Sequence, residues 1–187
     1  RVRSMLPSTN RLFLREFTAD DWIAVHRYAS DPQVVEWMWW GPNSRDETQQ
    51  FLAAAAAASQ TSPRTDFHFA AIRREDDLLL GTVSLAIRSE RDANAELGYC
   101  LAPDSQGQGF GREAVSALVT YGFESLGLHR IHAWISPPNM RSRALIEALG
   151  FRLEGEALRN AFVRGEWQDS LLYAVVCDEW SVTNAQP

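Results

Sequence analysis

Two spacings of hydrophobic residues divide the chain into a helix-rich first part and a strand-rich second part. Residues 11–17 alternate between apolar and polar side chains as a strand does, and residues 22–29 carry apolar side chains at helical spacing. The aromatic run 34–40 is stopped by Gly41-Pro42. A serine with a glutamate three residues later, a capping-box pattern, opens the alanine-rich stretch 44–58. The first part is therefore expected to contain one strand followed by two or three helices.

From residue 66 the hydrophobic period changes to two, with helical spacing in two places. Strand patterns cover residues 66–73, 78–87, 93–101, 130–136, 151–158 and 167–177, and helical patterns cover 109–126 and 139–149. Short polar connections join the first three strands, which predicts an antiparallel meander. The third strand, the helix after it and the fourth strand form a βαβ unit, whose strands run parallel by the right-handed crossover rule. The pattern predicts an α+β domain, in three layers, with a mixed, mostly antiparallel central sheet and flanking helices.

Composition and charge narrow the class of protein. The chain has 187 residues, 45% of them hydrophobic and 22% charged, which suits one globular domain, expected over 11–180 with terminal tails at 1–10 and 181–187. A net charge of −6 without a long basic run makes nucleic acid an unexpected partner. The two cysteines and four histidines have no ligand spacing, so we expect neither a disulfide framework nor a metal site. No signal-peptide pattern or membrane-length apolar run is present, and we expect a cytoplasmic protein with no membrane partner.

The segment PDSQGQGFGR, residues 103–112, lies between a predicted strand and a predicted helix and contains three glycines. Such a junction directs free backbone N–H groups and the positive end of the helix to one place, where an anion such as phosphate is the expected occupant. The nucleoside-triphosphate P-loop needs a lysine, and this chain has none. The dinucleotide pattern GxGxxG fails because the third glycine comes one residue early. The alternative to an anion-binding loop is a tight, solvent-exposed connection. Such a connection would need only one or two glycines, whereas this segment has three.

Two motifs together carry a family resemblance. The sequence QGQGFG at 106–111 resembles the pyrophosphate-binding loop of the GNAT acyl-CoA N-acyltransferase superfamily. The segment 139–151, NMRSRALIEALGF, is similar to the second coenzyme-binding helix of that family, at the expected distance downstream. AELGY at 95–99, together with Asp169-Ser170 and Glu179-Trp180, looks like the RimJ/RimL branch. The resemblance covers about residues 11–180.

The resemblance implies a fold and a cosubstrate. The parallel strands 93–101 and 130–136 would splay apart at their C-terminal ends, and the pantetheine of acetyl-CoA would lie between them. Asn139 is also expected to cap its helix, a role that coexists with coenzyme binding. The residues that the resemblance assigns to the coenzyme are Tyr99, Cys100, Leu101, Gln106, Gly107, Gln108, Gly109, Phe110, Gly111, Arg112, Asn139 and Ser142.

Two side chains are candidates for proton transfer. Strand alternation puts Glu96 on one face with Gly98 and Cys100, where it can take the proton of the amine directly or through a water; the alternative is a solvated carboxylate. Many family members carry a tyrosine as the acid at the position that Ile146 occupies here. Ser142 can hydrogen-bond the leaving sulfur in its place, or it can satisfy its own helix start.

The amine acceptor is less constrained by the sequence. Of Trp37, Trp39 and Trp40, we expect at least one to lie in the core and the others to form a wall of the acceptor cleft. Trp167 and Asp169 are expected on the other side of that cleft. Asp169 has the alternative role of fixing a hairpin. The expected acceptor is a protein or peptide N-terminal amino group. One alternative acceptor is a small amine, either a polyamine or an aminoglycoside. A polyamine would need an acidic cleft, which the acids at 36, 46 and 47 leave open. The other alternative is a non-catalytic acyl-CoA-binding module. The protein is expected to be a monomer or a homodimer.

Overall fold

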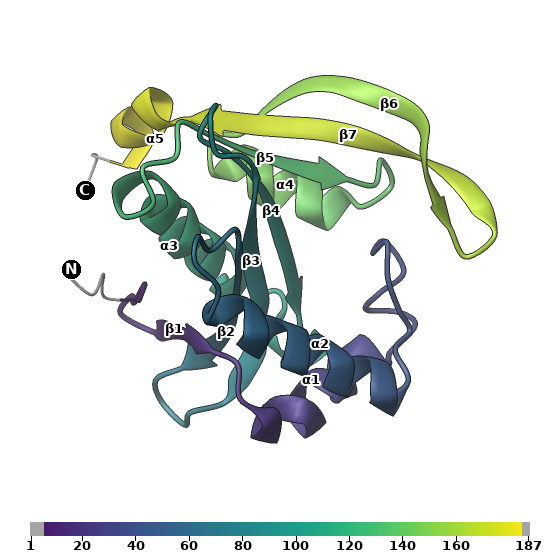
Figure 1. Cartoon of the computed structure of the whole chain (residues 1–187). Helices are drawn as coiled ribbons and strands as arrows, with labels where there is room; N and C mark the ends of the chain where they lie inside the picture. The colour runs from purple at the N-terminus through teal and green to yellow at the C-terminus, as the bar shows by residue number, and fades with distance from the viewer. Residues whose placement is uncertain (1–5, 185–187) are drawn as a thin grey trace.

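The computed structural model describes residues 6–184, which form one seven-stranded sheet with helices on both faces (Figure 1). The strands are β1 (Leu12–Glu16), β2 (Asp66–Arg73), β3 (Leu79–Ser89), β4 (Asn94–Leu101), β5 (Arg130–Ile135), β6 (Arg152–Val163) and β7 (Glu166–Val176). The helices are α1 (Trp22–Ala29), α2 (Arg45–Ser59), α3 (Phe110–Glu124), α4 (Met140–Ala148) and α5 (Cys177–Asn184), with short 3₁₀ turns at Ala19–Asp21 and Pro103–Ser105.

The strand order is β1-β2-β3-β4-β5-β7-β6, and every neighbouring pair is antiparallel except β4 and β5. The predicted meander is β2, β3 and β4, and α3 makes the crossover that brings β5 parallel to β4. The α+β fold class expected from the hydrophobic pattern is therefore confirmed. The two strands of its βαβ unit are neighbours at the centre of the sheet.

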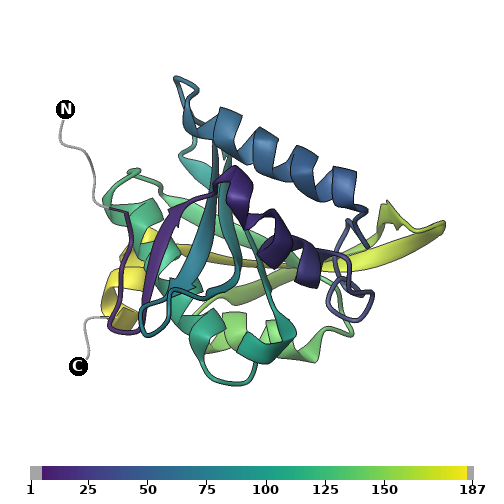
Figure 2. The same ribbon diagram turned by 90° about the horizontal axis from the view of Figure 1, so that it is seen from below.

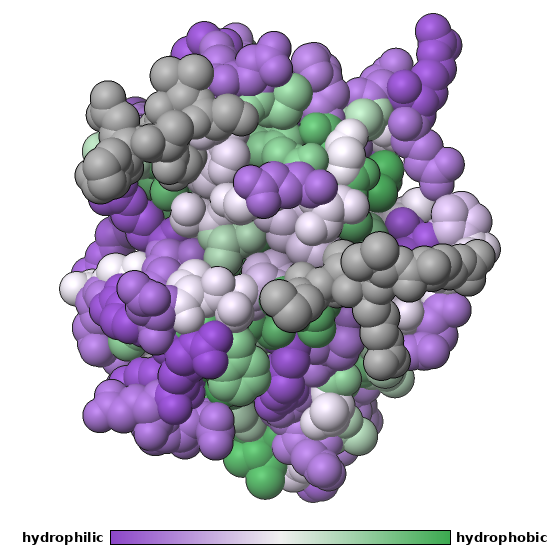
Figure 3. All heavy atoms as spheres, turned by 90° about the vertical axis from the view of Figure 1, so that its left-hand side faces the viewer, coloured by the Kyte–Doolittle hydropathy of each residue, from purple (hydrophilic) through white to green (hydrophobic). Residues whose placement is uncertain are grey.

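The helices form two layers on opposite faces of the sheet (Figure 2). On one face α3 and α4 bury their apolar sides in a core that includes Val115, Leu118 and Ile146 against β4 and β5. On the other face Tyr28 of α1 and Leu52 of α2 pack over the opposite side of β2 to β4. The side of the molecule that carries α3 and α5 is mostly hydrophilic, with small apolar areas between polar ones (Figure 3).

Two segments differ from the sequence expectation. Residues 32–40 form turns and bends and no helix, and within them Val35 is buried at 1% exposure while Trp39 and Trp40 remain 43% and 41% exposed. The last strand ends at Val176, and α5 follows where no helix was expected. Its first turn carries two acids, Asp178 and Glu179, which favour a helix N-terminus.

Candidate active site

The parallel strands β4 and β5 separate halfway along their length. Their pairing runs from Asn94↔Arg130 to Glu96↔His132 and then stops. Strand β4 nevertheless continues to Leu101, and β5 continues to Ile135. The two strands therefore diverge over their C-terminal halves and leave backbone groups of β4 without a strand partner on that side.

The direction of these backbone groups follows from the pairing of β4 with β3. The N–H of Ala102 donates to the carbonyl oxygen of Leu80 at 2.8 Å, and β4 keeps a regular register with β3 from Ala95 to Leu101. Because N–H groups point alternately to the two edges of a strand, those of Tyr99 and Leu101 point away from β3. Two backbone donors thus face the gap between β4 and β5.

The glycine-rich segment connects the end of β4 to α3. Gly107 has φ +74° and Gly109, the N-cap of α3, has φ +79°, a conformation that disfavours other residues. Gly111 has a different role, because a Cβ there would lie 2.6 Å from Leu101 Cδ1 and 3.1 Å from Leu145 Cδ1. Two glycines therefore shape the loop at the helix start, and the third lets α3 pack closely on β4 and α4.

Polar side chains hold this loop in place and leave its helix end cationic. Gln106 Nε2 donates to the Leu101 carbonyl oxygen at 3.0 Å, and its Oε1 accepts from Arg141 Nη1 at 3.2 Å. Gln108 Nε2 donates to the backbone of the preceding turn at 2.7 Å. Arg112 Nη2, on the first turn of α3, donates to a carbonyl oxygen of α4 at 3.3 Å. Helix N–H groups, positive-φ glycines and two exposed arginines are a chemically suitable set for the phosphates of a coenzyme.

Two hydroxyl groups meet at the edge of this gap. Asn139 Oδ1 caps α4 by accepting from the N–H of Ser142 at 3.1 Å, as the sequence predicts. Ser142 Oγ lies 2.5 Å from the hydroxyl oxygen of Tyr99. Burial raises the pKa of Tyr99 to about 12, so this phenol keeps its proton at neutral pH. Ile146 is fully buried in the core and takes no part in this pair.

Sequence reasoning assigned Tyr99 to the coenzyme through its backbone and missed its hydroxyl. The signal was present, because strand alternation directs Tyr99 to the face of the sheet that carries α4.

Glu96 lies on the predicted face of β4 and is paired there. Its Oε2 accepts from Arg88 Nε at 2.9 Å and lies 4.0 Å from His132 Nε2. Burial lowers the pKa of His132. The Glu96 side chain is 25% exposed. It lies two residues before Gly98, on the same face of β4, and Gly98 lines a cavity on that face. To accept a proton from the amine, the Glu96 carboxylate would therefore have to bind the amine while it stays hydrogen-bonded to Arg88.

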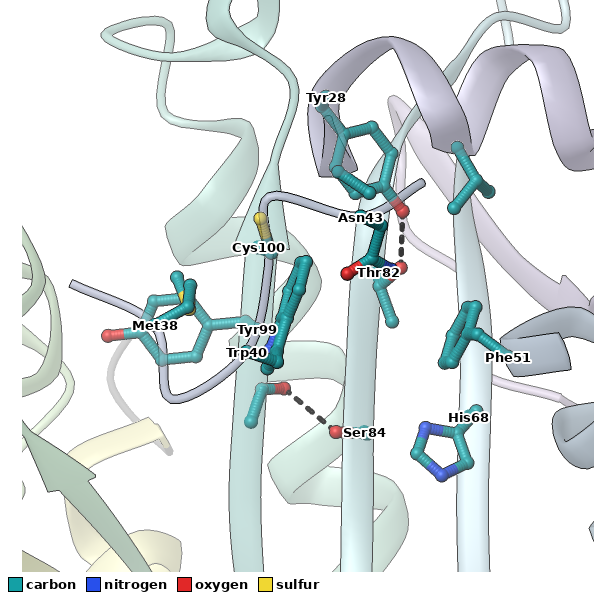
Figure 4. Close-up of a pocket in the computed structure, with 13 residues that line it drawn as sticks. Tyr28, Met38, Trp40, Asn43, Phe51, His68, Thr82, Ser84, Tyr99 and Cys100 are labelled. Atoms are coloured by element: carbon teal, nitrogen blue, oxygen red, sulfur yellow. Dashed lines mark hydrogen bonds between the residues drawn. The ribbon is translucent and has the colours of Figure 1, made fainter. Parts of the chain in front are cut away.

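A cavity of about 370 Å³ lies on the opposite face of the sheet from the glycine-rich loop. Strand β4 contributes Gly98, Tyr99 and Cys100 to its wall, so the cavity borders the gap between β4 and β5. Met38 and Trp40, from the segment between α1 and α2, lie at the side of Tyr99 (Figure 4). The gap thus has the loop and the start of α3 on one face of the sheet and a cavity on the other.

A row of residues across three strands forms the polar part of the cavity. His68 pairs with Ser84, and Ser84 pairs with Gly98, so all three share one face of the sheet. Ser84 Oγ is 3.4 Å from the carbonyl oxygen of Gly98, and the ring of Phe51 meets His68 edge-on at 5.7 Å (Figure 4). Sequence reasoning did not select His68 or Ser84, although period-two alternation on adjacent strands was the signal that could have found them.

The structure places only some of the predicted acceptor residues at the cavity. Trp40 lines it, whereas Trp37 and Trp39 do not. Trp167 is 62% exposed near the turn between β6 and β7 and packs on Phe162, with ring centroids 5.1 Å apart.

Asp169 lies on the same hairpin as Trp167 and away from the cavity. Its Oδ1 accepts from the N–H of Arg159 at 2.7 Å, across the two strands. This contact is the hairpin-fixing arrangement that the sequence left as the alternative for Asp169.

Within residues 6–184 no group of three or more His, Cys, Asp or Glu side chains is arranged to hold a metal ion. No helix in the same part of the chain has the length and apolar character needed to cross a membrane.

Known proteins resemble this chain in both sequence and structure. The acetyltransferase (GNAT) domain family matches residues 11–152. The uncharacterized N-acetyltransferase YnaD of Bacillus subtilis is 30% identical over 93% of this chain and 98% of its own length. A crystal structure of a GNAT-family acetyltransferase from Bacillus anthracis superposes with a TM-score of 0.82 at 28% identity, covering 94% of this chain and all of that one.

Shorter matches involve relatives with stated acceptors. The [ribosomal protein uS5]-alanine N-acetyltransferase of Escherichia coli is 36% identical over 46% of this chain and 44% of its own length. A spermidine N(1)-acetyltransferase of Vibrio cholerae is 33% identical over 49% of this chain and 53% of its own. The domain match and the N-acetyltransferase relatives agree, and the non-catalytic alternative finds no support among them. The chain therefore belongs to the GNAT acetyltransferase family and is an N-acetyltransferase with ribosomal-protein (RimJ-like) relatives.

Proposed function

We propose that this N-acetyltransferase transfers the acetyl group of acetyl-CoA to a single primary amine, the N-terminal α-amino group of a protein or peptide. The observation that carries this proposal is the divergence of β4 from β5 between the glycine-rich loop on one face and the cavity on the other. The arrangement gives the coenzyme and the amine separate approaches to one reacting centre. The relative that acts on ribosomal protein uS5 alanine supports the choice of acceptor. The expected cytoplasmic location agrees with this choice and stays a prediction.

The coenzyme would be held by backbone groups. Its pyrophosphate meets the N–H groups at the start of α3, where Gly107 and Gly109 permit a close approach. The acyl carbonyl lies beside the N–H groups of Tyr99 and Leu101, which stabilise negative charge on its oxygen as the amine attacks. Because a thioester is already activated, positioning of this kind supplies much of the rate.

Two side chains would move the protons. Glu96 takes a proton from the amine, directly or through a water, while the new C–N bond forms. As the C–S bond breaks, Ser142 gives its hydroxyl proton to the sulfur and recovers one from Tyr99, 2.5 Å away. This sequence leaves an amide, a free thiol and an enzyme that bulk water returns to its starting protonation state.

The polyamine alternative rests on the relative that acts on spermidine. The acids that left it open do not line the cavity: Glu36 is exposed, and Glu47 accepts from the N–H of Ser44 at 2.7 Å in the predicted capping box. An acceptor with several ammonium groups would find no partner charges there.

The test is release of free thiol from acetyl-CoA with a panel of acceptors. Peptides with a free N-terminus should give turnover, and the same peptides with a blocked N-terminus should leave the signal at background. Spermidine and an aminoglycoside complete the panel. If spermidine is consumed faster than every peptide, the polyamine alternative replaces the proposal; background signal with all acceptors contradicts both.

A further inference from the structure

The cavity beside Tyr99 carries no charged side chain. Its thirteen lining residues include no aspartate, glutamate or arginine. The carboxylate next along β4, Glu96, already pairs with Arg88 outside the lining. A ligand in this cavity therefore meets no fixed counter-charge.

The titratable groups of the cavity are also biased to their uncharged forms. Burial raises the pKa of Tyr28, whose hydroxyl lies 2.5 Å from Thr82 Oγ1, and raises the pKa of Cys100 to about 12. Tyr99 behaves in the same way. Burial lowers the pKa of His68, so its imidazole is neutral near pH 7. At physiological pH the whole lining is neutral.

The remaining surface is mostly apolar and aromatic. Val25, Met38, Trp40 and Phe51 supply much of it, and the polar contribution comes from the row of His68 and Ser84 with neighbouring hydroxyl and amide groups. The volume of about 370 Å³ corresponds to roughly a dozen water molecules at liquid density. Such a space is far larger than the methyl group of an alanine, and it lies within the size range of small-molecule sites.

An ammonium group entering this cavity would lose its hydration without gaining a carboxylate partner, which is costly. An uncharged apolar group would instead gain by leaving water. Discrimination between acceptors is therefore set by the part of the molecule that enters the cavity, while the reacting amine stays at the gap between β4 and β5.

We infer that the acceptor is a monoamine whose amine is attached to a bulky, uncharged and mainly apolar group that fills this cavity. Within the proposed function, on which this inference rests, the acceptor is a peptide with a large apolar first residue, and a simple alkylamine serves as a probe of the same reacting amine with its apolar group. Polyamines, amino sugars and peptides with a charged first residue are poor acceptors. His68 and Ser84 are specificity-determining residues, because they supply the polar side chains of the row that ends at Gly98, next to the gap between β4 and β5.

The test compares hexylamine with 1,6-diaminohexane, which have the same length and the same reacting amine and differ by one terminal ammonium. The wild-type protein should show a kcat/KM at least about tenfold higher for hexylamine, because the second ammonium must be buried unpaired or the chain must stay outside. Peptides that begin with Phe, Ala or Lys extend the comparison, and the Phe peptide should be the best. Equal or better turnover of the diamine by the wild-type protein overturns the inference.

Introducing a carboxylate into the cavity tests whether its uncharged lining is what selects against a second ammonium group. His68→Asp should move the hexylamine-to-diamine ratio by about tenfold toward the diamine, because the new carboxylate can pair with the second ammonium. His129→Asp makes the same substitution at an exposed position away from the cavity and should leave the ratio unchanged. An unchanged ratio in a folded His68→Asp protein, or an equal change in the control, contradicts the inference. Absence of thiol release with any amine would instead contradict the proposed function.

Discussion

The hydroxyl groups of Ser142 and Tyr99 lie 2.5 Å apart at the place where β4 leaves β5. The family resemblance leads us to expect a tyrosine as the acid at position 146, where this chain has Ile146. Ile146 is fully buried and helps to pack α4 on the sheet. We therefore propose that a hydroxyl on β4 and one on α4 together take the acid role that the family resemblance assigns to a single tyrosine.

Ser142→Ala should lower kcat by about tenfold to 100-fold, because the leaving thiolate loses its proton donor while being a good leaving group in itself. Tyr99→Phe should have a smaller effect in the same direction. The cap of α4 survives in both variants, since Asn139 accepts from the backbone N–H of residue 142. Steady-state kinetics with either substrate varied measure the effect, and an unchanged kcat in Ser142→Ala removes this role.

Glu96→Gln tests the proton acceptor through the pH profile. Near about pH 6 most of the amine is ammonium, so loss of a proton acceptor should depress kcat/KM strongly; near about pH 9 more of it is neutral and the loss should shrink. Glu154→Gln is the matched control, because Glu154 also pairs with an arginine, Arg130 Nη1 at 2.8 Å, and does not line the cavity. A Glu96→Gln profile parallel to the wild-type profile argues against the role.

At the scale of elements, the glycine-rich loop combines two requirements in one short segment. Gly107 and Gly109 are needed for their positive φ, whereas Gly111 is needed for helix packing. The sequence showed three glycines but could not separate these functions, because the packing partners Leu101 and Leu145 come from different elements.

Gly109→Val and Gly111→Val should therefore fail in different ways. Gly109→Val strains the loop by about 1–3 kcal/mol and should weaken acetyl-CoA binding while the fold persists. Gly111→Val introduces atoms into the contact of α3 with β4 and α4 and should lower the melting temperature first. Calorimetric affinity and thermal unfolding of both variants separate the two roles. Wild-type affinity in Gly109→Val would contradict the phosphate-loop assignment.

The turn between β6 and β7 is tied to the segment that walls the cavity. Arg164 Nη2 donates to the carbonyl oxygens of Glu36 at 2.7 Å and Met38 at 3.2 Å, and Nη1 donates to that of Gly41 at 3.2 Å. This segment lacks helix or strand, so one guanidinium satisfies several of its carbonyl groups. The side chains of Met38 and Trp40 are thereby held over the cavity from a distant part of the chain.

Arg164→Ala should raise the KM for the amine by about tenfold, with little change in the KM for acetyl-CoA, because hydrogen bonds from a charged donor are worth about 1.5–3 kcal/mol. Arg159→Ala is the matched control, since Arg159 is on the same hairpin with the same φ of +50° and makes its contact to Asp169 through the backbone. A parallel change in both KM values would indicate general loss of structure and not loss of the cavity wall.

At the scale of the whole molecule, the sheet separates two approaches to one centre. Helices α3 and α4 lie on one face of the sheet, and α1 and α2 lie on the other (Figures 1 and 2). The cavity lies on the face of α1 and α2, and the divergence of β4 from β5 connects the two faces. A bound coenzyme would bridge β4, α3 and α4, in addition to the packing and the few hydrogen bonds that already join them.

Acetyl-CoA should therefore stabilise the folded protein as a whole. At a ligand concentration 100 times the dissociation constant, the stabilisation is about 2.7 kcal/mol. Thermal unfolding should show a rise in melting temperature that grows with acetyl-CoA concentration, and Gly109→Val should need more ligand for the same rise. A melting temperature that does not respond to acetyl-CoA would contradict coenzyme binding at this loop.

The sequence by itself determined the local features: the period of the strands and of helices α1 to α4, the capping residues Ser44 and Asn139, and the strand-to-helix turn with its glycines. These follow from side-chain spacing and backbone preference within a few residues. The family motifs are local in the same sense, so the coenzyme side of the site could be proposed from the sequence alone.

Only the tertiary structure decided which side chains meet. The row of His68, Ser84 and Gly98 depends on the register of three strands, and the contact of Arg164 with residues 36–41 joins segments more than 120 positions apart. The pairing of Glu96 with Arg88 and of Tyr99 with Ser142 likewise depends on neighbours that no local period specifies. The acceptor side of the site is built from such long-range contacts, and its neutral cavity became visible only when the sheet and both helical layers were assembled.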